Sequence, residues 1–166
     1  TTTYLWAALQ AQHPPAGAVT TVETRIGTHT EPPISGHRAF LEAAARLHRE
    51  GGRHFALELT STALGMGFMA AWPVRVGVFT NLSPDHDDQH QSPEHYLASK
   101  AQLFVHLPTS GTAILNASDP NGRLLMDVVP EDLVPLLELA HRPVISAKQF
   151  SRDKLVQLCR LAARYE

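Results

Sequence analysis

The segment that decides the fold is residues 76–104, which read VGVFTNLSPDHDDQHQSPEHYLASKAQLF. The apolar residues at its start predict a short buried strand, and the turn residues after them end that strand. An acidic turn with histidines, residues 85–90, follows at once, and then a helix that carries Lys100. In open α/β sheets, ligands bind beyond the carboxyl ends of strands. This order of elements therefore predicts a metal site at the end of a buried strand.

Lys100 stands out because it is the only lysine between Thr1 and Ala147, where the other basic positions are arginine or histidine. Unlike arginine, a lysine can lose its proton when burial or a neighbouring cation lowers its pKa. The neutral amine is a nucleophile that can react with CO2 to give a carbamate. The alternative is a helix-surface lysine whose stem covers apolar area.

A second acidic position, Glu58, interrupts the apolar run 54–61 just before a Thr-Ser turn. The run predicts a buried strand, and carboxylates are seldom buried without a partner. A glutamate at the carboxyl end of a parallel strand can bind a divalent cation. The alternative is a glutamate that faces solvent at the end of its strand. Two neighbouring strands that both end in candidate ligands favour the metal site.

The chain opens with a hydroxyl-rich helix, Thr1–Leu9, that neither a strand nor a glycine loop precedes. In a phosphate-binding loop of the form GxxxxGK[ST], the helix starts at the Lys-Ser/Thr pair, and further threonines often follow. We therefore expect a helix that has been cut off from its beginning. The alternative is that the threonines simply cap the helix.

Five segments, in order along the chain, match motifs of one family. They are Thr1–Leu5 with the end of GKTTTTYL, Glu58–Leu64 with EVSSHAL, Phe79–Gln91 with FTNLSRDHLDYHG, Tyr96–Phe104 with YFAAKARLF, and Leu115–Gly122 with INADDPYG. On these motifs the chain resembles the central, ATP-binding domain of the Mur ligases. It is most like the UDP-MurNAc-tripeptide synthetase branch, which adds the third amino acid of the peptidoglycan stem peptide.

The resemblance implies a role for each matched position. In the family, the glutamate matching Glu58 bridges two Mg²⁺ ions, the histidine matching His86 binds the second ion, and the lysine matching Lys100 is carbamylated and helps to hold it. These three residues are thus implied to be catalytic and metal-binding. The asparagine matching Asn116 contacts the adenine. The implied nucleotide-binding residues are Thr1, Thr2, Asn116 and Asp119, and the implied substrate-binding residues are Thr60 and Ser61.

The implied activity is ATP-dependent formation of an amide, with ATP and Mg²⁺ as cofactors. A substrate carboxylate attacks the γ-phosphate to give an acyl phosphate and ADP, and an amino acid then displaces phosphate. Phosphoryl transfer between anions depends mainly on positioning and charge neutralisation. Carbamylation would convert Lys100 from a cation into an anionic metal ligand, which arginine cannot become.

The chain also departs from the family pattern. The glycine loop and its lysine are missing, Thr62 replaces the histidine of SSHAL, and Pro84 replaces the arginine before Asp-His. We therefore expect no ligation by this chain alone. The alternatives are a degenerate, non-catalytic module or structural spacer in a longer fusion protein, and an unrelated hydrolase that uses the Asp/His turn as its own metal site. An intact GxxxxGK upstream would favour the ligase.

Composition fits one globular domain in a chain of 166 residues, with 43% hydrophobic residues and a net charge of −2. Nothing in it suggests nucleic-acid or membrane binding. The single cysteine, Cys159, excludes an internal disulfide and fits a reducing cytoplasm. The expected partners are small molecules, namely a nucleotide-sugar peptide or another carboxylate and an amino acid, together with other domains of the same polypeptide.

The Mur-like motifs place an incomplete central domain at residues 1–130, followed by a linker and helical tail at 131–166. The tail residues 142–166 resemble the amino-terminal start of aspartate carbamoyltransferases, which predicts the start of a following domain of that kind.

Helical and strand patterns alternate along the chain. Helices are expected at 1–12, 38–50, 93–106 and from about Gly122, and strands at 18–26, 54–60, 75–80 and 112–117. This alternation predicts an α/β fold with a three-layer, mainly parallel sheet and helices on both faces. The resemblance makes this fold that of a P-loop or Mur-ligase central domain, truncated at its amino end.

Overall fold

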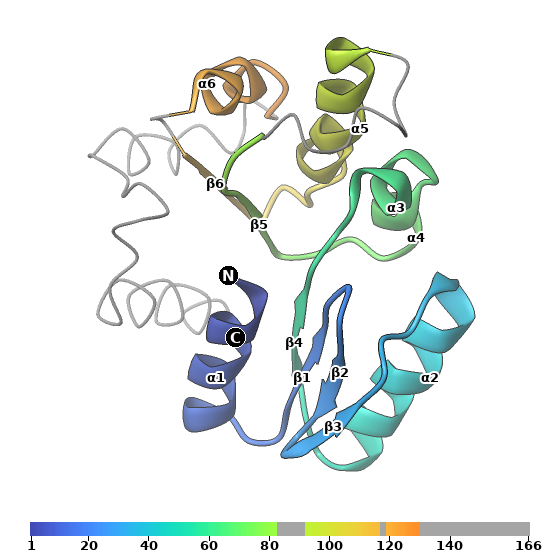
Figure 1. The fold of residues 1–166 in the computed structure, drawn as a ribbon. Helices are drawn as coiled ribbons and strands as arrows, with labels where there is room; N and C mark the ends of the chain where they lie inside the picture. The colour runs from blue at the N-terminus through green and yellow to red at the C-terminus, as the bar shows by residue number, and fades with distance from the viewer. Residues whose placement is uncertain (83–91, 117–118, 130–166) are drawn as a thin grey trace. The chain divides into compact units, whose positions relative to one another are not determined.

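The computed structural model describes residues 1–82, 92–116 and 119–129 (Figure 1). These residues divide between two compact units, one of residues 1–59 and a second that starts at Thr60. The amino-terminal unit contains α1 (Thr2–Gln12), β1 (Ala16–Val19), β2 (Thr24–Ile26), β3 (His29–Glu31), α2 (Gly36–Arg49) and β4 (His54–Leu57). The second unit contains α3 (Ser61–Gly65), α4 (Phe68–Ala71), β5 (Val76–Phe79), α5 (Pro93–Val105), β6 (Thr112–Leu115) and α6 (Pro120–Met126).

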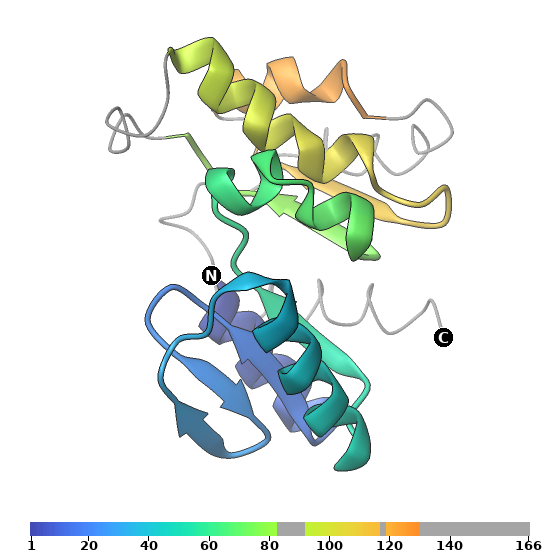
Figure 2. The same cartoon turned by 90° about the vertical axis from the view of Figure 1, so that its right-hand side faces the viewer.

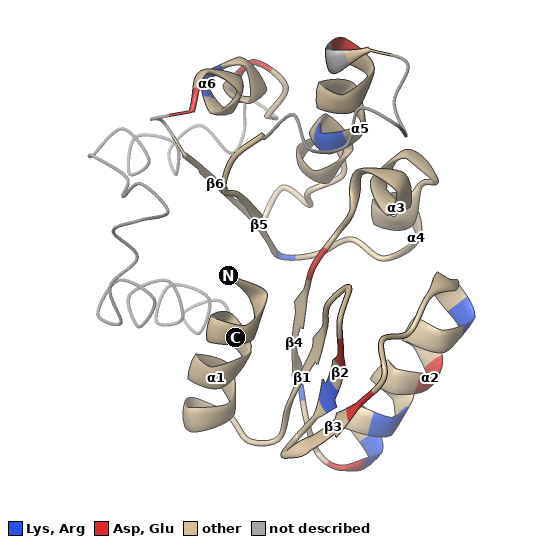
Figure 3. Ribbon diagram, in the orientation of Figure 1, with Lys and Arg blue, Asp and Glu red and all other residues tan. Residues whose placement is uncertain are grey.

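The amino-terminal unit is a three-layer arrangement around a four-stranded sheet of order β3-β2-β1-β4. Strands β1 and β4 are parallel, whereas β2 pairs antiparallel with both β1 and β3. Helices α1 and α2 cover opposite faces of this sheet (Figures 1 and 2). Helix α1 carries no charged residue, whereas α2 carries both signs (Figure 3).

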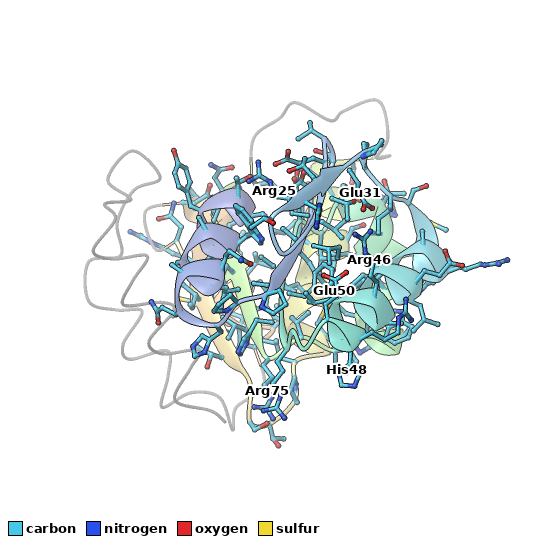
Figure 4. All side chains as sticks on the ribbon, turned by 90° about the horizontal axis from the view of Figure 1, so that it is seen from below. Arg25, Glu31, Arg46, His48, Glu50 and Arg75 are labelled. Carbon is cyan, nitrogen blue, oxygen red and sulfur yellow. The ribbon has the colours of Figure 1, made fainter. Side chains whose placement is uncertain are left out.

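A glycine allows close packing on the face covered by α2. A Cβ at Gly17 would lie 2.7 Å from the Phe55 ring, so only glycine leaves room for that ring over β1. Phe55 in turn meets the edge of Phe40 from α2, with the ring centroids 5.7 Å apart. At the rim of this face, Arg46 of α2 binds both Glu31 and Glu50, and the three side chains point toward one another in Figure 4.

On the opposite face, α1 is fixed to the first residue of β1. The Trp6 indole donates to the Ala16 carbonyl at 3.1 Å, and the Gln10 side chain accepts from the Ala16 amide at 2.8 Å. The guanidinium of Arg25, on β2, lies 4.4 Å from the centre of the Trp6 ring. These contacts hold α1 against the sheet although none of its residues is fully buried.

The second unit is built on the parallel pair β5–β6. Helix α5 packs on this pair through Leu103, whose Cγ would lie 3.2 Å from a Cβ at Gly77. The largest fully buried side chains of this unit are Phe104, Leu64, Met69, Leu115 and Leu125. No helix of the described residues is long and apolar enough to span a membrane.

The predicted α/β class is confirmed, and the predicted helices at 1–12, 38–50 and 93–106 correspond to α1, α2 and α5. The predicted single strand at 18–26 was wrong, because the chain turns back at Thr20–Glu23 and forms the hairpin β1–β2. That turn contains neither glycine, proline nor asparagine, so it gave no turn signal. The four-stranded sheet therefore contains antiparallel pairs that were not predicted, and β5–β6 forms a second sheet. The pairs β1–β4 and β5–β6 are parallel as expected.

Candidate functional site

Glu58 lies one residue beyond the end of β4, and it is exposed. Its amide donates to the Val19 carbonyl at 2.9 Å, which extends the parallel pairing of β1 and β4 by one more hydrogen bond. The expectation of a buried strand over 54–60 was therefore wrong at Glu58, because the strand ends at Leu57. A carboxylate at this position keeps its hydration instead of paying a desolvation penalty.

Both carboxylate oxygens of Glu58 are bound by one residue of the β1–β2 turn. The Thr21 amide donates to Oε2 at 3.2 Å, and the Thr21 hydroxyl donates to Oε1 at 3.3 Å. An ionised carboxylate has about four acceptor positions on its two oxygens, so positions remain for other ligands. Sequence reasoning missed Thr21, because no spacing pattern connects it to a residue 37 positions later in the chain.

Lys100 lies in the middle of α5 and is half-buried. Its ammonium nitrogen is 5.7 Å from the centre of the Tyr96 ring, one helical turn earlier, a distance at which a cation is attracted to the ring face. At the start of α5, the Ser92 hydroxyl accepts from the His95 amide. The pKa of the Glu94 carboxyl is lower than its usual value, mainly because of a hydrogen bond with Ser92 and to a smaller extent because of one with the Glu94 backbone.

Asn116 and Asp119 connect the end of β6 to the segment that leaves β5. The Asn116 side-chain amide donates to the Thr80 carbonyl at 2.8 Å, and the Leu82 amide donates to Asp119 Oδ2 at 3.1 Å. Asp119 Oδ1 accepts from the Asn121 amide at 2.8 Å and caps α6. We call Asn116, Asp119 and the Thr80 and Leu82 backbone groups they bind the strand-end clasp. The two side chains implied to bind nucleotide thus also hold the chain that leads to the acidic turn.

The remaining implied site residues lie at helix starts. Thr1 is the amino-terminal cap position of α1 without a capping hydrogen bond from its side chain, and Thr2 is the first helical residue. Thr60 caps α3, because its hydroxyl accepts from the Ala63 amide at 3.2 Å. Ser61 is buried. The turn predicted at Thr60-Ser61 is therefore the beginning of a short helix.

His86 and the rest of the acidic turn lie outside the described residues, as does the tail 142–166. Glu58 belongs to the amino-terminal unit and Lys100 to the second unit. The convergence of Glu58, His86 and Lys100 on one metal therefore stays a prediction. Within residues 1–82, 92–116 and 119–129, no three His, Cys, Asp or Glu side chains gather as metal ligands would.

The side chains of Glu58 and Lys100 differ in how well they suit Mg²⁺. The ion prefers oxygen ligands, keeps several waters and usually takes one or two carboxylates from the protein. Glu58 fits this chemistry because its carboxylate is exposed, fixed in place and only partly used by Thr21. Lys100 as an ammonium has no lone pair to offer, so it fits only after conversion to a carbamate.

The chain is therefore an α/β protein in which the parallel pairs β1–β4 and β5–β6 are each followed by polar residues directly beyond their strand ends. The family model of the Mur ligase middle domain matches residues 1–154, and the chain belongs to the Mur ligase family. The resemblance to the tripeptide synthetase branch is confirmed by relatives named UDP-N-acetylmuramoyl-L-alanyl-D-glutamate--2,6-diaminopimelate ligase.

Two such relatives show the extent of the similarity. The ligase of Synechocystis sp. is 36% identical over 110 residues, which are 66% of this chain and 21% of the relative. The ligase of Ectopseudomonas mendocina is 43% identical over 99 residues, which are 60% of this chain and 20% of the relative. The chain thus spans about a fifth of the length of these relatives.

A solved structure of a ligase with the same name superimposes with a TM-score of 0.64 at 23% identity. The superposition covers 76% of this chain and 26% of that chain. It supports the fold described above.

Proposed function

We propose that the chain is part of an ATP-dependent ligase that joins a carboxylate to an amino acid in peptidoglycan synthesis. Family membership and the names of the relatives support this proposal. The structural observation that carries it is the exposed Glu58 carboxylate, held at the carboxyl end of the parallel pair β1–β4. That edge of a sheet is where α/β proteins bind their ligands. The substrates would be small molecules, and the reaction would take place in the cytoplasm.

In this proposal Glu58, His86 and Lys100 would hold Mg²⁺, which would supply the positive charge that neutralises phosphate in phosphoryl transfer. Lys100 contributes after its neutral amine adds to CO2, which forms a nitrogen–carbon bond and releases a proton. The product is an anionic carbamate whose oxygens suit Mg²⁺. Thr1, Thr2 and Asp119 would bind the nucleotide, and Asn116 would contact its adenine.

These 166 residues contain no GxxxxGK[ST] loop. We propose that they do not ligate by themselves, because the backbone amides and lysine that neutralise ATP phosphates are absent. The alternative function is a non-catalytic module or spacer within a longer protein. One measurement distinguishes the ligase from the non-catalytic module, namely ADP release by a polypeptide that carries these residues together with an intact phosphate loop. The ligase should release ADP, and the non-catalytic module should not.

Lys100→Arg tests the proposal in that longer polypeptide. Arginine keeps the positive charge but cannot form a carbamate, so we expect ADP release to fall by about 10²-fold or more at unchanged thermal stability. Lys100→Ala should regain part of its activity when short carboxylates are added in place of the carbamate. Activity of Lys100→Arg equal to that of the unmodified protein would show that this lysine is an ordinary helix residue.

A further inference from the structure

The turn between β1 and β2 is fixed by a buried threonine. The Thr20 hydroxyl donates to the Glu23 carbonyl at 3.0 Å and accepts from the Val22 and Glu23 amides at 3.3 and 3.0 Å. The Thr20 amide also donates to the Glu23 carbonyl, at 2.9 Å. Thr20 is only 6% exposed, so water competes little for its hydroxyl. The turn therefore fixes the backbone at Thr21 independently of its contact with Glu58.

The backbone at Glu58 is held independently. Its amide is part of the hydrogen-bonded pairing of β4 with β1, through the Val19 carbonyl. Thr21 follows Val19 by two residues, so the same strand places both the turn and the end of β4. The backbone does not fix the Glu58 side chain, and a glutamate side chain without a partner loses rotamer entropy when a ligand orders it.

We propose that Thr21 is a positioning residue that orients the Glu58 carboxylate for a divalent cation, by binding one oxygen with its amide and the other with its hydroxyl. This inference rests on the proposed function, because it takes Glu58 as a metal ligand. Two donors from one residue fix the plane of the carboxylate, which a single donor cannot do. The acceptor positions that Thr21 leaves on each oxygen then point in a constant direction.

A mutation can remove the Thr21 hydroxyl, but it leaves the Thr21 amide in place. Thr21→Val keeps the amide and the shape of the side chain but loses the donor to Oε1. Loss of a partner that orients a metal ligand typically costs 10- to 100-fold in metal affinity, and the exposure of this pair places the expected loss at about tenfold. Thr21→Ser keeps the hydroxyl and should bind the cation like the unmodified chain.

The test uses the full 166-residue chain, labelled for NMR and titrated with Mn²⁺ as a paramagnetic substitute for Mg²⁺. Mn²⁺ should broaden the amide signals of Thr21 and Glu58, and Thr21→Val should need about tenfold more Mn²⁺ for equal broadening. Thr21→Ala is the second variant, and the signals away from the turn report that each variant is folded. Thr30→Val, an exposed threonine on β3 of the same unit, is the matched control and should titrate like the unmodified chain.

A Glu58→Gln variant separates the two levels of the proposal. If Glu58→Gln abolishes the broadening but Thr21→Val and Thr21→Ala leave it unchanged, the positioning role is wrong and the metal-binding role stands. If the unmodified chain shows no broadening at Glu58, or Glu58→Gln does not change it, the assignment of Glu58 as a ligand fails and the positioning role fails with it. A serine variant that titrates like the valine variant would also overturn the account.

Discussion

The ends of β4 and β5 are both held by hydrogen bonds, but the bonds hold different parts of the chain. Both strands lie in parallel pairs and lead into residues of the candidate site. At the end of β4 a side chain is held, because Thr21 binds the carboxylate of Glu58. At the end of β5 the backbone is held, because Asn116 and Asp119 bind Thr80 and Leu82. The contact at β4 therefore fixes one side chain, whereas the contacts at β5 fix the main chain at Thr80 and Leu82.

This difference predicts different costs of mutation. The contact at Glu58 is exposed, so removing it should change ligand geometry with little effect on stability. The strand-end clasp is half-buried and involves the start of a helix, so damage to it should lower stability. Of the following four changes, given in order of expected effect, three test that contrast and one, Thr24→Val, tests the strand β2 that follows the turn.

Gly122→Ala should have the largest effect. A Cβ at Gly122 would overlap the Asn116 carbonyl oxygen, and that oxygen belongs to backbone rather than to a flexible side chain. We expect a loss of about 1–3 kcal/mol in the free energy of unfolding, typical of overpacking, measured by urea denaturation. Gly65→Ala is the comparison, because Gly65 has no positive φ and a Cβ there would meet no atom nearer than 3.5 Å. An equal loss in the two variants would contradict a specific close approach at Gly122.

Asp119→Ala should cost about 1 kcal/mol, because it removes the cap of α6 and the acceptor for the Leu82 amide. Amide hydrogen exchange at Leu82 should become faster at the same time. Asp119→Asn keeps an acceptor oxygen and serves as the control, with a smaller loss. Unchanged exchange at Leu82 in Asp119→Ala would show that Asp119 acts only as a helix cap.

Thr24→Val removes a buried hydroxyl of the amino-terminal unit that makes no hydrogen bond. Thr24 is 1% exposed, and its Oγ1 has no hydrogen-bond partner. An unsatisfied buried group costs about 1–3 kcal/mol, part of which the variant should recover. We expect the urea midpoint to rise by the equivalent of about 1 kcal/mol, whereas Thr20→Val should lower it, since the Thr20 hydroxyl fixes the turn. A lower midpoint for Thr24→Val would mean that its hydroxyl is satisfied in solution.

Thr21→Val should have the smallest effect on stability, within about 0.5 kcal/mol, as is usual for exposed positions. Its urea midpoint and slope should equal those of the unmodified chain, even where its Mn²⁺ titration differs. A loss of about 1 kcal/mol or more would show that the contact with Glu58 stabilises the sheet, and the contrast between the two strand ends would disappear.

The sequence predicted α1, α2 and α5 and the strands β4, β5 and β6 because apolar periodicity and caps are local signals, as in α5 with Ser92 before Pro93. The short helices α3 and α4 were not predicted. It missed the β1–β2 turn because the fold of that turn depends on the Thr20 hydroxyl rather than on a turn-forming residue type. Glu58 and Lys100 were singled out by residue type and position alone. Their partners, Thr21 and Tyr96, were not assigned, because the first pairing exists only after the sheet has formed and the second depends on a rotamer.

The docking of α1 on its sheet gives the protein an optical reporter. The chain has two tryptophans, and Trp6 combines an indole hydrogen bond to Ala16 with a guanidinium stacked on its ring. Both contacts influence emission, and both vanish when α1 leaves the sheet. The other tryptophan, Trp72, belongs to the second unit. In a Trp72→Phe variant, tryptophan fluorescence would therefore report on the amino-terminal unit alone. In a Trp6→Phe variant it would report on the second unit alone. The unfolding of each unit can thus be followed separately in the same polypeptide.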